Sequence, residues 1–214
     1  MKKIIILCFL QALIYGCDNK GFLIENNNKK LKEYKIDFED TLVDQFPNKI
    51  PYSNVNVVSN TNVKKNDIGL LLYEYEVDGG DIKNIRKKFG KRAIAKYKSS
   101  DSCFLVVNRF ETDETYEKFE VVEAIDSTEV NKECAKQLYP IPNFIGSTYS
   151  KGKNDIKLDD SFEIYVLESK AGNHFKKFDV QPSPQMPDQW KNGYSKGIAL
   201  SEKNKTIIYW SIIW

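Results

Sequence analysis

The sequence has little of the material from which most active sites are built. It contains a single histidine, His174, among 214 residues, and only four cysteines. The CxxC spacing and the paired histidines of a zinc site do not occur, and no acidic run has the alternating spacing of a calcium loop. The GxSxG, GxGxxG and GxxxxGKS/T motifs do not occur either. We therefore expect no metal ion, no cofactor and no catalytic set of a familiar kind.

A long apolar stretch is also lacking. The N-terminal run, residues 4–15, holds about a dozen residues, whereas a membrane-spanning helix needs about 20. Lys2 and Lys3 precede this run, and Gly16 and Cys17 follow it. A basic start, a short apolar centre and a small residue before a cleavage site are typical of an export signal.

The last residues of this segment carry a second pattern. Ile14, Gly16 and Cys17 stand as an aliphatic residue, a glycine and a cysteine in the stretch "IYGC", which resembles the lipobox of bacterial lipoproteins. The resemblance implies a diacylglycerol on the sulfur of Cys17, cleavage of the chain before it and acylation of the new amino group. Plain secretion and an uncleaved N-terminal anchor are the alternatives.

The lipobox divides the chain into three parts. Residues 1–16 would be a cleaved signal peptide, and residues 17–35 a lipidated cysteine followed by a flexible tether rich in Asn and Lys. Residues 36–214 would form the globular domain. The protein would then be anchored by lipid to a membrane of the cell envelope, facing the periplasm or the exterior.

An excess of positive charge is missing as well. The chain has 32 basic and 30 acidic residues, and cleavage after residue 16 would remove Lys2 and Lys3, which leaves equal numbers. Nucleic-acid binding depends on an excess of Lys and Arg that neutralises phosphates. We therefore expect no nucleic-acid partner.

Two cysteines remain after the N-terminal segment is set aside. Cys8 leaves with the signal peptide and Cys17 is the lipidation candidate, so Cys103 and Cys134 form an even pair in an exported chain. Such pairs are candidates for a disulfide. Two separate buried thiols are the alternative.

Hydrophobic patterning predicts one α+β domain with a mainly antiparallel sheet and a C-terminal β-hairpin. Strands and helices are interspersed without a repeating rhythm, and no internal repeat is visible. The helix starting near residue 82 has Asp81 as a candidate N-cap. The expected strands are 54–59, 67–77, 92–98, 103–110, 117–125 and 161–169, the hairpin strands 193–201 and 205–214, and the helices 37–46, 82–89 and 127–139.

Aromatic residues gather near the C-terminus. Trp190 and Tyr194 follow a proline-rich loop and form a candidate binding surface, because aromatic rings offer large and rigid contact areas. Tyr209, Trp210 and Trp214 lie in the last strand. A strand buried on both faces is the favoured interpretation of that last segment.

Together these features favour a non-catalytic protein-binding or inhibitory module, similar in role to an immunity protein, that meets its partner at the envelope. One alternative is a carbohydrate-binding lipoprotein that uses Trp190 and Tyr194. Another is a hydrolase with a carboxylate pair that the sequence does not reveal, or with His174 as a base.

Overall fold

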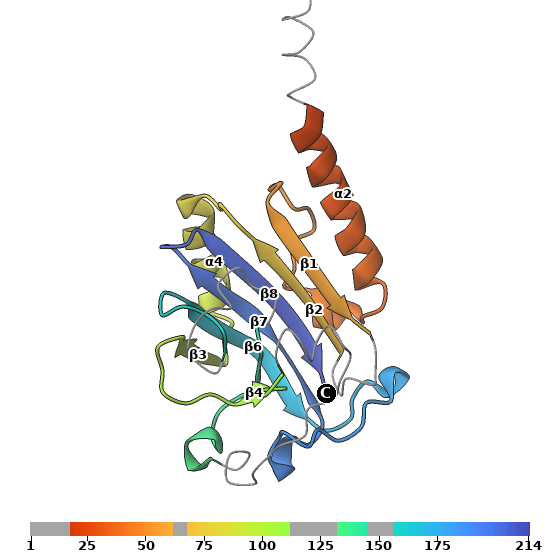
Figure 1. Ribbon diagram of the computed structural model, residues 1–214, viewed down its shortest axis with the longest axis vertical. Coiled ribbons are helices and arrows are strands. Elements are labelled where there is room, and N and C mark those ends of the chain that lie inside the picture. Colours follow the sequence, from red (N-terminus) through yellow and green to blue (C-terminus); the bar gives the residue numbers. More distant parts are fainter. Residues whose placement is uncertain (1–17, 62–67, 112–131, 145–155) are drawn as a thin grey trace, which may run out of the picture.

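An antiparallel sheet of six strands, in the order β1-β2-β8-β7-β6-β3, forms the centre of the molecule (Figure 1). The computed structural model describes residues 18–61, 68–111, 132–144 and 156–214. The predicted α+β class, antiparallel sheet and C-terminal hairpin are confirmed. The strands of this sheet are β1 (Val55–Asn60), β2 (Ile68–Glu74), β3 (Ala95–Lys98), β6 (Glu163–Ala171), β7 (Gly193–Ser201) and β8 (Thr206–Ile213).

The hairpin β7–β8 lies in the middle of the sheet and is buried on both faces. Along β8, Ile207 and Tyr209 belong to one hydrophobic cluster, whereas Ile208 and Trp210 belong to the other. Successive side chains of a strand point to opposite faces, so a continuous apolar run fills two cores at once. The interpretation of the C-terminal aromatics as a core strand is therefore confirmed.

One face of the sheet is covered by helices. Leu31, Leu42 and Ile82 each bring one helix into the cluster on this face. The third helix is capped by Asp78, whose side chain accepts a hydrogen bond from the Gly80 nitrogen at 2.7 Å, in place of the expected cap Asp81. The helices are α2 (Asp18–Lys35), α3 (Asp40–Val43) and α4 (Gly79–Gly90). The 3-10 turns η2 (Glu133–Ala135), η3 (Lys176–Phe178) and η4 (Asp188–Trp190) come later in the chain.

The other face is covered mainly by loops and a small parallel pair of strands, β4 (Val106–Val107) and β5 (Ile141–Pro142). The strand expected over 103–110 is reduced to these two residues of β4, because its apolar side chains pack as a loop against the sheet. The strand expected over 117–125 lies outside the described residues. Of the helix expected over 127–139, residues 132–139 are described, and they form the short 3-10 turn η2 and irregular chain in place of an α-helix.

Helix α2 stands where the sequence predicted a flexible tether. Its Leu31 is buried in the core, and its Asn28 exchanges two hydrogen bonds with the backbone of Ile50, at 3.0 and 2.7 Å. Asn27 also donates to the carbonyl of Ser53 at 3.2 Å. The packed part of the chain therefore begins before residue 36. Figure 1 shows the N-terminal end of α2 projecting beyond the sheet.

Candidate functional site

The two candidate disulfide cysteines are joined in the structure. The sulfurs of Cys103, just before β4, and Cys134, in η2, are bonded at 1.99 Å with their Cα atoms 6.2 Å apart. The bond ties together two segments of the layer that covers the sheet face opposite the helices. A cross-link between residues 31 apart in the sequence stabilises a fold by limiting the freedom of the unfolded chain, so its role here is structural.

Trp190 and Tyr194 do not form a common surface. Tyr194 is only 6% exposed, packs in the helix-side cluster and donates a hydrogen bond from its hydroxyl to Glu168 at 2.6 Å. Trp190 is half-buried against the opposite cluster, where its ring is tilted by 43° to that of Trp214. A sugar-stacking platform needs exposed and roughly coplanar rings. The sequence-based candidate surface therefore has the wrong geometry, because the sheet separates its two residues.

His174 lies on the surface, away from any acidic partner in the described part of the chain. Its Nε2 atom is 2.8 Å from the carbonyl oxygen of Ala171, and its ring meets Tyr194 edge-on. These contacts fix a turn after β6 and leave the imidazole without the orienting carboxylate of a general base. The described residues also include no group of three side chains suited to hold a metal ion.

A buried lysine links the sheet to the segment around α3. The Nζ atom of Lys196 lies 2.9 Å from Asp44 and 3.3 Å from Glu168, and it donates to the carbonyl of Thr41. Partial burial acts to raise the pKa of Glu168, but hydrogen bonds from Tyr194, Lys170 and Lys196 outweigh it and bring that pKa to about 2. A buried lysine in contact with two carboxylates and a carbonyl oxygen is typical of a structural ion pair.

Glu74 is a second buried ionisable group, at the end of β2. Burial and, to a smaller extent, the negative charge of Asp81 raise the pKa of Glu74 to about 7, although a hydrogen bond with Tyr209 acts in the opposite direction. Its Oε1 atom has no hydrogen-bond partner among the described residues. A carboxyl with a pKa near neutrality could transfer protons, but Glu74 lies in the packed core and lines none of the larger grooves found in the described part of the chain.

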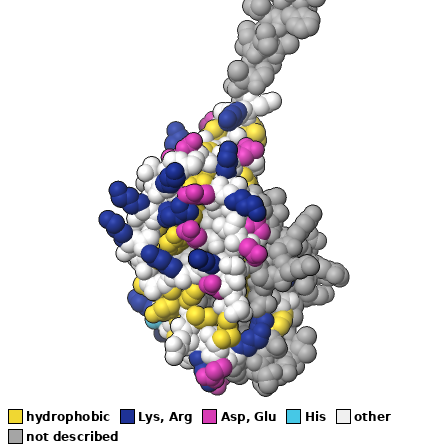
Figure 2. Space-filling model, turned by 90° about the vertical axis from the view of Figure 1, so that its left-hand side faces the viewer, with side chains coloured by type: hydrophobic (Ala, Val, Ile, Leu, Met, Phe, Trp, Pro, Cys, Tyr) yellow, Lys and Arg dark blue, Asp and Glu magenta, His cyan; other side chains and the backbone are white. Residues whose placement is uncertain are grey.

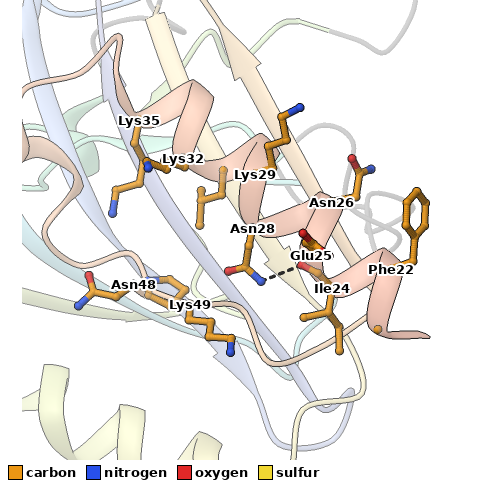
Figure 3. A pocket seen from close by; sticks show the side chains of 13 residues that line it. Phe22, Ile24, Glu25, Asn26, Asn28, Lys29, Lys32, Lys35, Asn48 and Lys49 are labelled. Carbon is orange, nitrogen blue, oxygen red and sulfur yellow. Dashed lines mark hydrogen bonds between the residues drawn. The ribbon is translucent and has the colours of Figure 1, made fainter. Parts of the chain in front are cut away.

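A large groove in the described structure runs along α2. It has a volume of about 1120 Å³ and lies between α2 and the loop Pro47–Lys49. The two walls are held at a fixed spacing because Asn28 of α2 is hydrogen-bonded to Ile50, directly after the loop. In Figure 3 Phe22 stands at one end of this α2 groove and Lys35 near the other.

The α2 groove combines an apolar base with a basic rim. Ile24, Leu31 and Pro47 contribute apolar surface, and one acidic side chain, Glu25, is present. The basic lining residues are Lys29, Lys32, Lys35 and Lys49, and the amides are Asn26, Asn28 and Asn48. This composition differs from the side of the domain that lies to the left in Figure 1, where basic and acidic side chains are intermixed (Figure 2).

The lysines of the α2 groove are poorly neutralised. Lys29 approaches Glu33 only to 4.0 Å, and both side chains are exposed. Lys32, Lys35 and Lys49 have no carboxylate within 4.0 Å in the part of the chain that is described. Partial burial lowers the pKa of Lys35, although Asp40 and Asp44 act to raise it. The rim therefore offers cationic donors to a ligand of opposite charge.

The sequence reasoning missed the α2 groove. The cluster of lysines between residues 29 and 35 was visible in the sequence. Only a helix, however, places residues three apart, such as Lys29, Lys32 and Lys35, on one side, where they face the loop at residues 47–49. Among the described residues, every helix is too short or too polar to span a bilayer.

Comparisons with protein-family models, with curated proteins and with solved structures found no match to this chain.

Proposed function

We propose that the protein is a lipoprotein of the bacterial cell envelope, anchored through an acylated Cys17, which binds or inhibits a partner protein through the α2 groove. The observation that carries the proposal is the place of α2 in the chain. This helix begins at Asp18, one residue after the candidate lipidation site, and supplies most of the groove lining. The element next to the membrane anchor is thus also the element that offers a binding surface.

The chemistry of the groove specifies the kind of partner. Three lysines that form no ion pair with another described residue, Lys32, Lys35 and Lys49, favour a segment that carries carboxylates. The apolar base, which includes Leu31, favours a segment that also has apolar side chains. Amides such as that of Asn48 can hydrogen-bond to a peptide backbone. An acidic, amphipathic segment of another envelope protein satisfies all three features.

The anchoring part of the proposal is tested by the state of Cys17. Mass spectrometry of the protein isolated from its native membrane is expected to show a mature chain that begins at an acylated Cys17. Cys17→Ser is expected to release the domain into the soluble fraction. An N-terminus at Met1, or unchanged membrane retention of Cys17→Ser, would contradict lipid anchoring.

The binding part is tested by photo-crosslinking in intact cells. A photoreactive amino acid is placed either at Asn48, which lines the groove and is exposed, or at Lys203, an exposed residue of the β7–β8 turn. A discrete adduct is expected from Asn48 and none of the same mass from Lys203. Lys32→Glu together with Lys49→Glu is expected to abolish the adduct, since it reverses two charges of the rim. An adduct that survives this reversal would refute the groove as the binding site.

A further inference from the structure

Two large apolar side chains are exposed side by side near the start of α2. Phe22 is 69% exposed and Leu23 is 47% exposed, and the other large exposed apolar residues in the described chain, Ile36 and Ile94, stand alone. Adjacent exposed apolar residues mark interaction sites more often than isolated ones do. Phe22 lies at the outer end of the α2 groove in Figure 3.

The short distance to Cys17 identifies what would cover these two residues. After cleavage at the lipobox only Cys17 would precede Asp18, where α2 begins. A helix rises 1.5 Å per residue, so Phe22 lies about 6 Å from the start of α2. The interfacial zone of each leaflet is about 5–8 Å deep, as the difference between the total and the hydrocarbon thickness indicates. An acylated Cys17 would therefore bring Phe22 and Leu23 to the lipid headgroups.

The attachment of α2 to the domain fixes how the helix meets the membrane. Its contacts with the domain lie at Asn27, Asn28 and Leu31, so the part before them projects freely (Figure 1). Successive residues of a helix point about 100° apart. An end-on helix brings both Phe22 and Leu23 to the membrane whatever the directions in which they point around the helix axis.

Lys20 adds an electrostatic contribution to the same end of α2. It is exposed and lies between the candidate anchor and the two apolar residues. A lysine close to an anionic membrane surface is attracted to it electrostatically. Phe22 and Leu23 suit the apolar interior of a membrane, and Lys20 suits its anionic headgroups.

We propose that Phe22 and Leu23 insert into the headgroup region of the membrane, so that α2 stands upright on the bilayer and holds the domain away from it. This inference rests on the proposed acylation of Cys17. The acyl chains would hold the chain at the membrane, and a protein contact beside them would orient the domain. The upright helix also fixes which side of the domain faces away from the membrane.

The experiment uses the full acylated protein in vesicles of phosphatidylethanolamine and phosphatidylglycerol, with tryptophan reporters at two positions. Phe22→Trp places the reporter at the proposed contact. Ile36→Trp is the matched control, because Ile36 is 74% exposed and lies just beyond the far end of α2. About 21 Å of helix separates the two positions. The unmodified protein supplies the background emission of the native tryptophans.

The readout is quenching by phospholipid brominated near the top of its acyl chains. The emission of each new tryptophan is the spectrum of the variant minus that of the unmodified protein. For Phe22→Trp this emission is expected to be blue-shifted and to lose most of its intensity in the presence of the brominated lipid. For Ile36→Trp the brominated lipid is expected to leave it unchanged. Quenching of both reporters would mean that α2 lies flat and would overturn the upright orientation. Quenching of neither, with acylation verified by mass spectrometry, would overturn membrane insertion while leaving lipid anchoring intact. A chain without acyl groups at Cys17 would overturn both proposals.

Discussion

The buried carboxyl of Glu74 leads to a specific expectation for stability as a function of pH. Glu74 is 3% exposed, and burial raises its pKa from 4.5 to about 7. Each unit of pKa difference between the folded and unfolded states is worth 1.36 kcal/mol, so this difference corresponds to about 3 kcal/mol. Removal of the ionisable group should therefore change the free energy of unfolding by about that amount at alkaline pH.

The sign follows from the direction of the change. The folded-state pKa of Glu74 lies above the unfolded value, so the folded protein binds the proton more tightly. The associated stability is fully present below about pH 4.5 and is lost as the pH rises through about 7. Above that pH the wild-type protein keeps a charged carboxylate in its core, with one oxygen that has no hydrogen-bond partner among the described residues.

The substitution Glu74→Gln removes the charge and nearly preserves the shape. Urea unfolding from pH 5 to 8.5, followed by tryptophan fluorescence, compares the two proteins, with the fully buried Trp210 as a reporter. We expect Glu74→Gln to gain stability relative to the wild type as the pH rises, by a total of about 3 kcal/mol. Parallel stability profiles would show that Glu74 has the same pKa in the folded and unfolded states, and a relative gain of Glu74→Gln as the pH falls would show that its folded-state pKa is lowered. Either result would refute the reasoning.

Two further predictions concern the packing of the sheet. Replacing both Cys103 and Cys134 by serine should lower the free energy of unfolding by roughly 3–4 kcal/mol in the chain-entropy model, for a sequence separation of 31, and should abolish the effect of a reductant on the urea midpoint. Gly197→Ala should lower the free energy of unfolding by at least about 1–3 kcal/mol, because a Cβ atom at this position would overlap the carbonyl oxygen of Tyr165. In the control Gly69→Ala the new Cβ atom would lie 3.4 Å from its nearest neighbour, so the urea midpoint should change little. Equal losses of stability in the two variants would refute the steric argument.

The central sheet could be predicted because its strands carry their own periodic signal. In the hairpin β7–β8 a polar turn separates the mixed run of β7 from the apolar run of β8, and an apolar run of this length predicts a buried strand from sequence alone. The same signal was ambiguous at 103–110. An apolar run does not distinguish a strand from a loop that packs on a sheet, and there the structure has only Val106–Val107 as a strand.

Helix α2 could not be predicted because its stability depends on distant contacts. Its sequence is rich in Asn and Lys and has few apolar residues, which in isolation favours an unstructured segment. The contacts that hold it, Leu31 in the core and Asn28 on the backbone of Ile50, join residues far apart in the sequence. Tertiary packing of this kind supplies most of the stability of protein helices. The α2 groove was missed for the same reason.

The two proposals constrain each other through the length of α2. An upright helix that begins at Asp18 would hold Lys29 about 17 Å and Lys35 about 26 Å above its membrane end. A partner segment that enters the α2 groove must then reach that height, so it belongs to a protein that is itself bound to the same membrane or lies close to it.

Confinement to one membrane raises the effective concentration of both proteins, so a groove of modest intrinsic affinity would suffice. The Cys17→Ser variant should therefore lose the Asn48 crosslink even though its groove is intact, whereas a crosslink of unchanged yield would show that the partner is captured from solution.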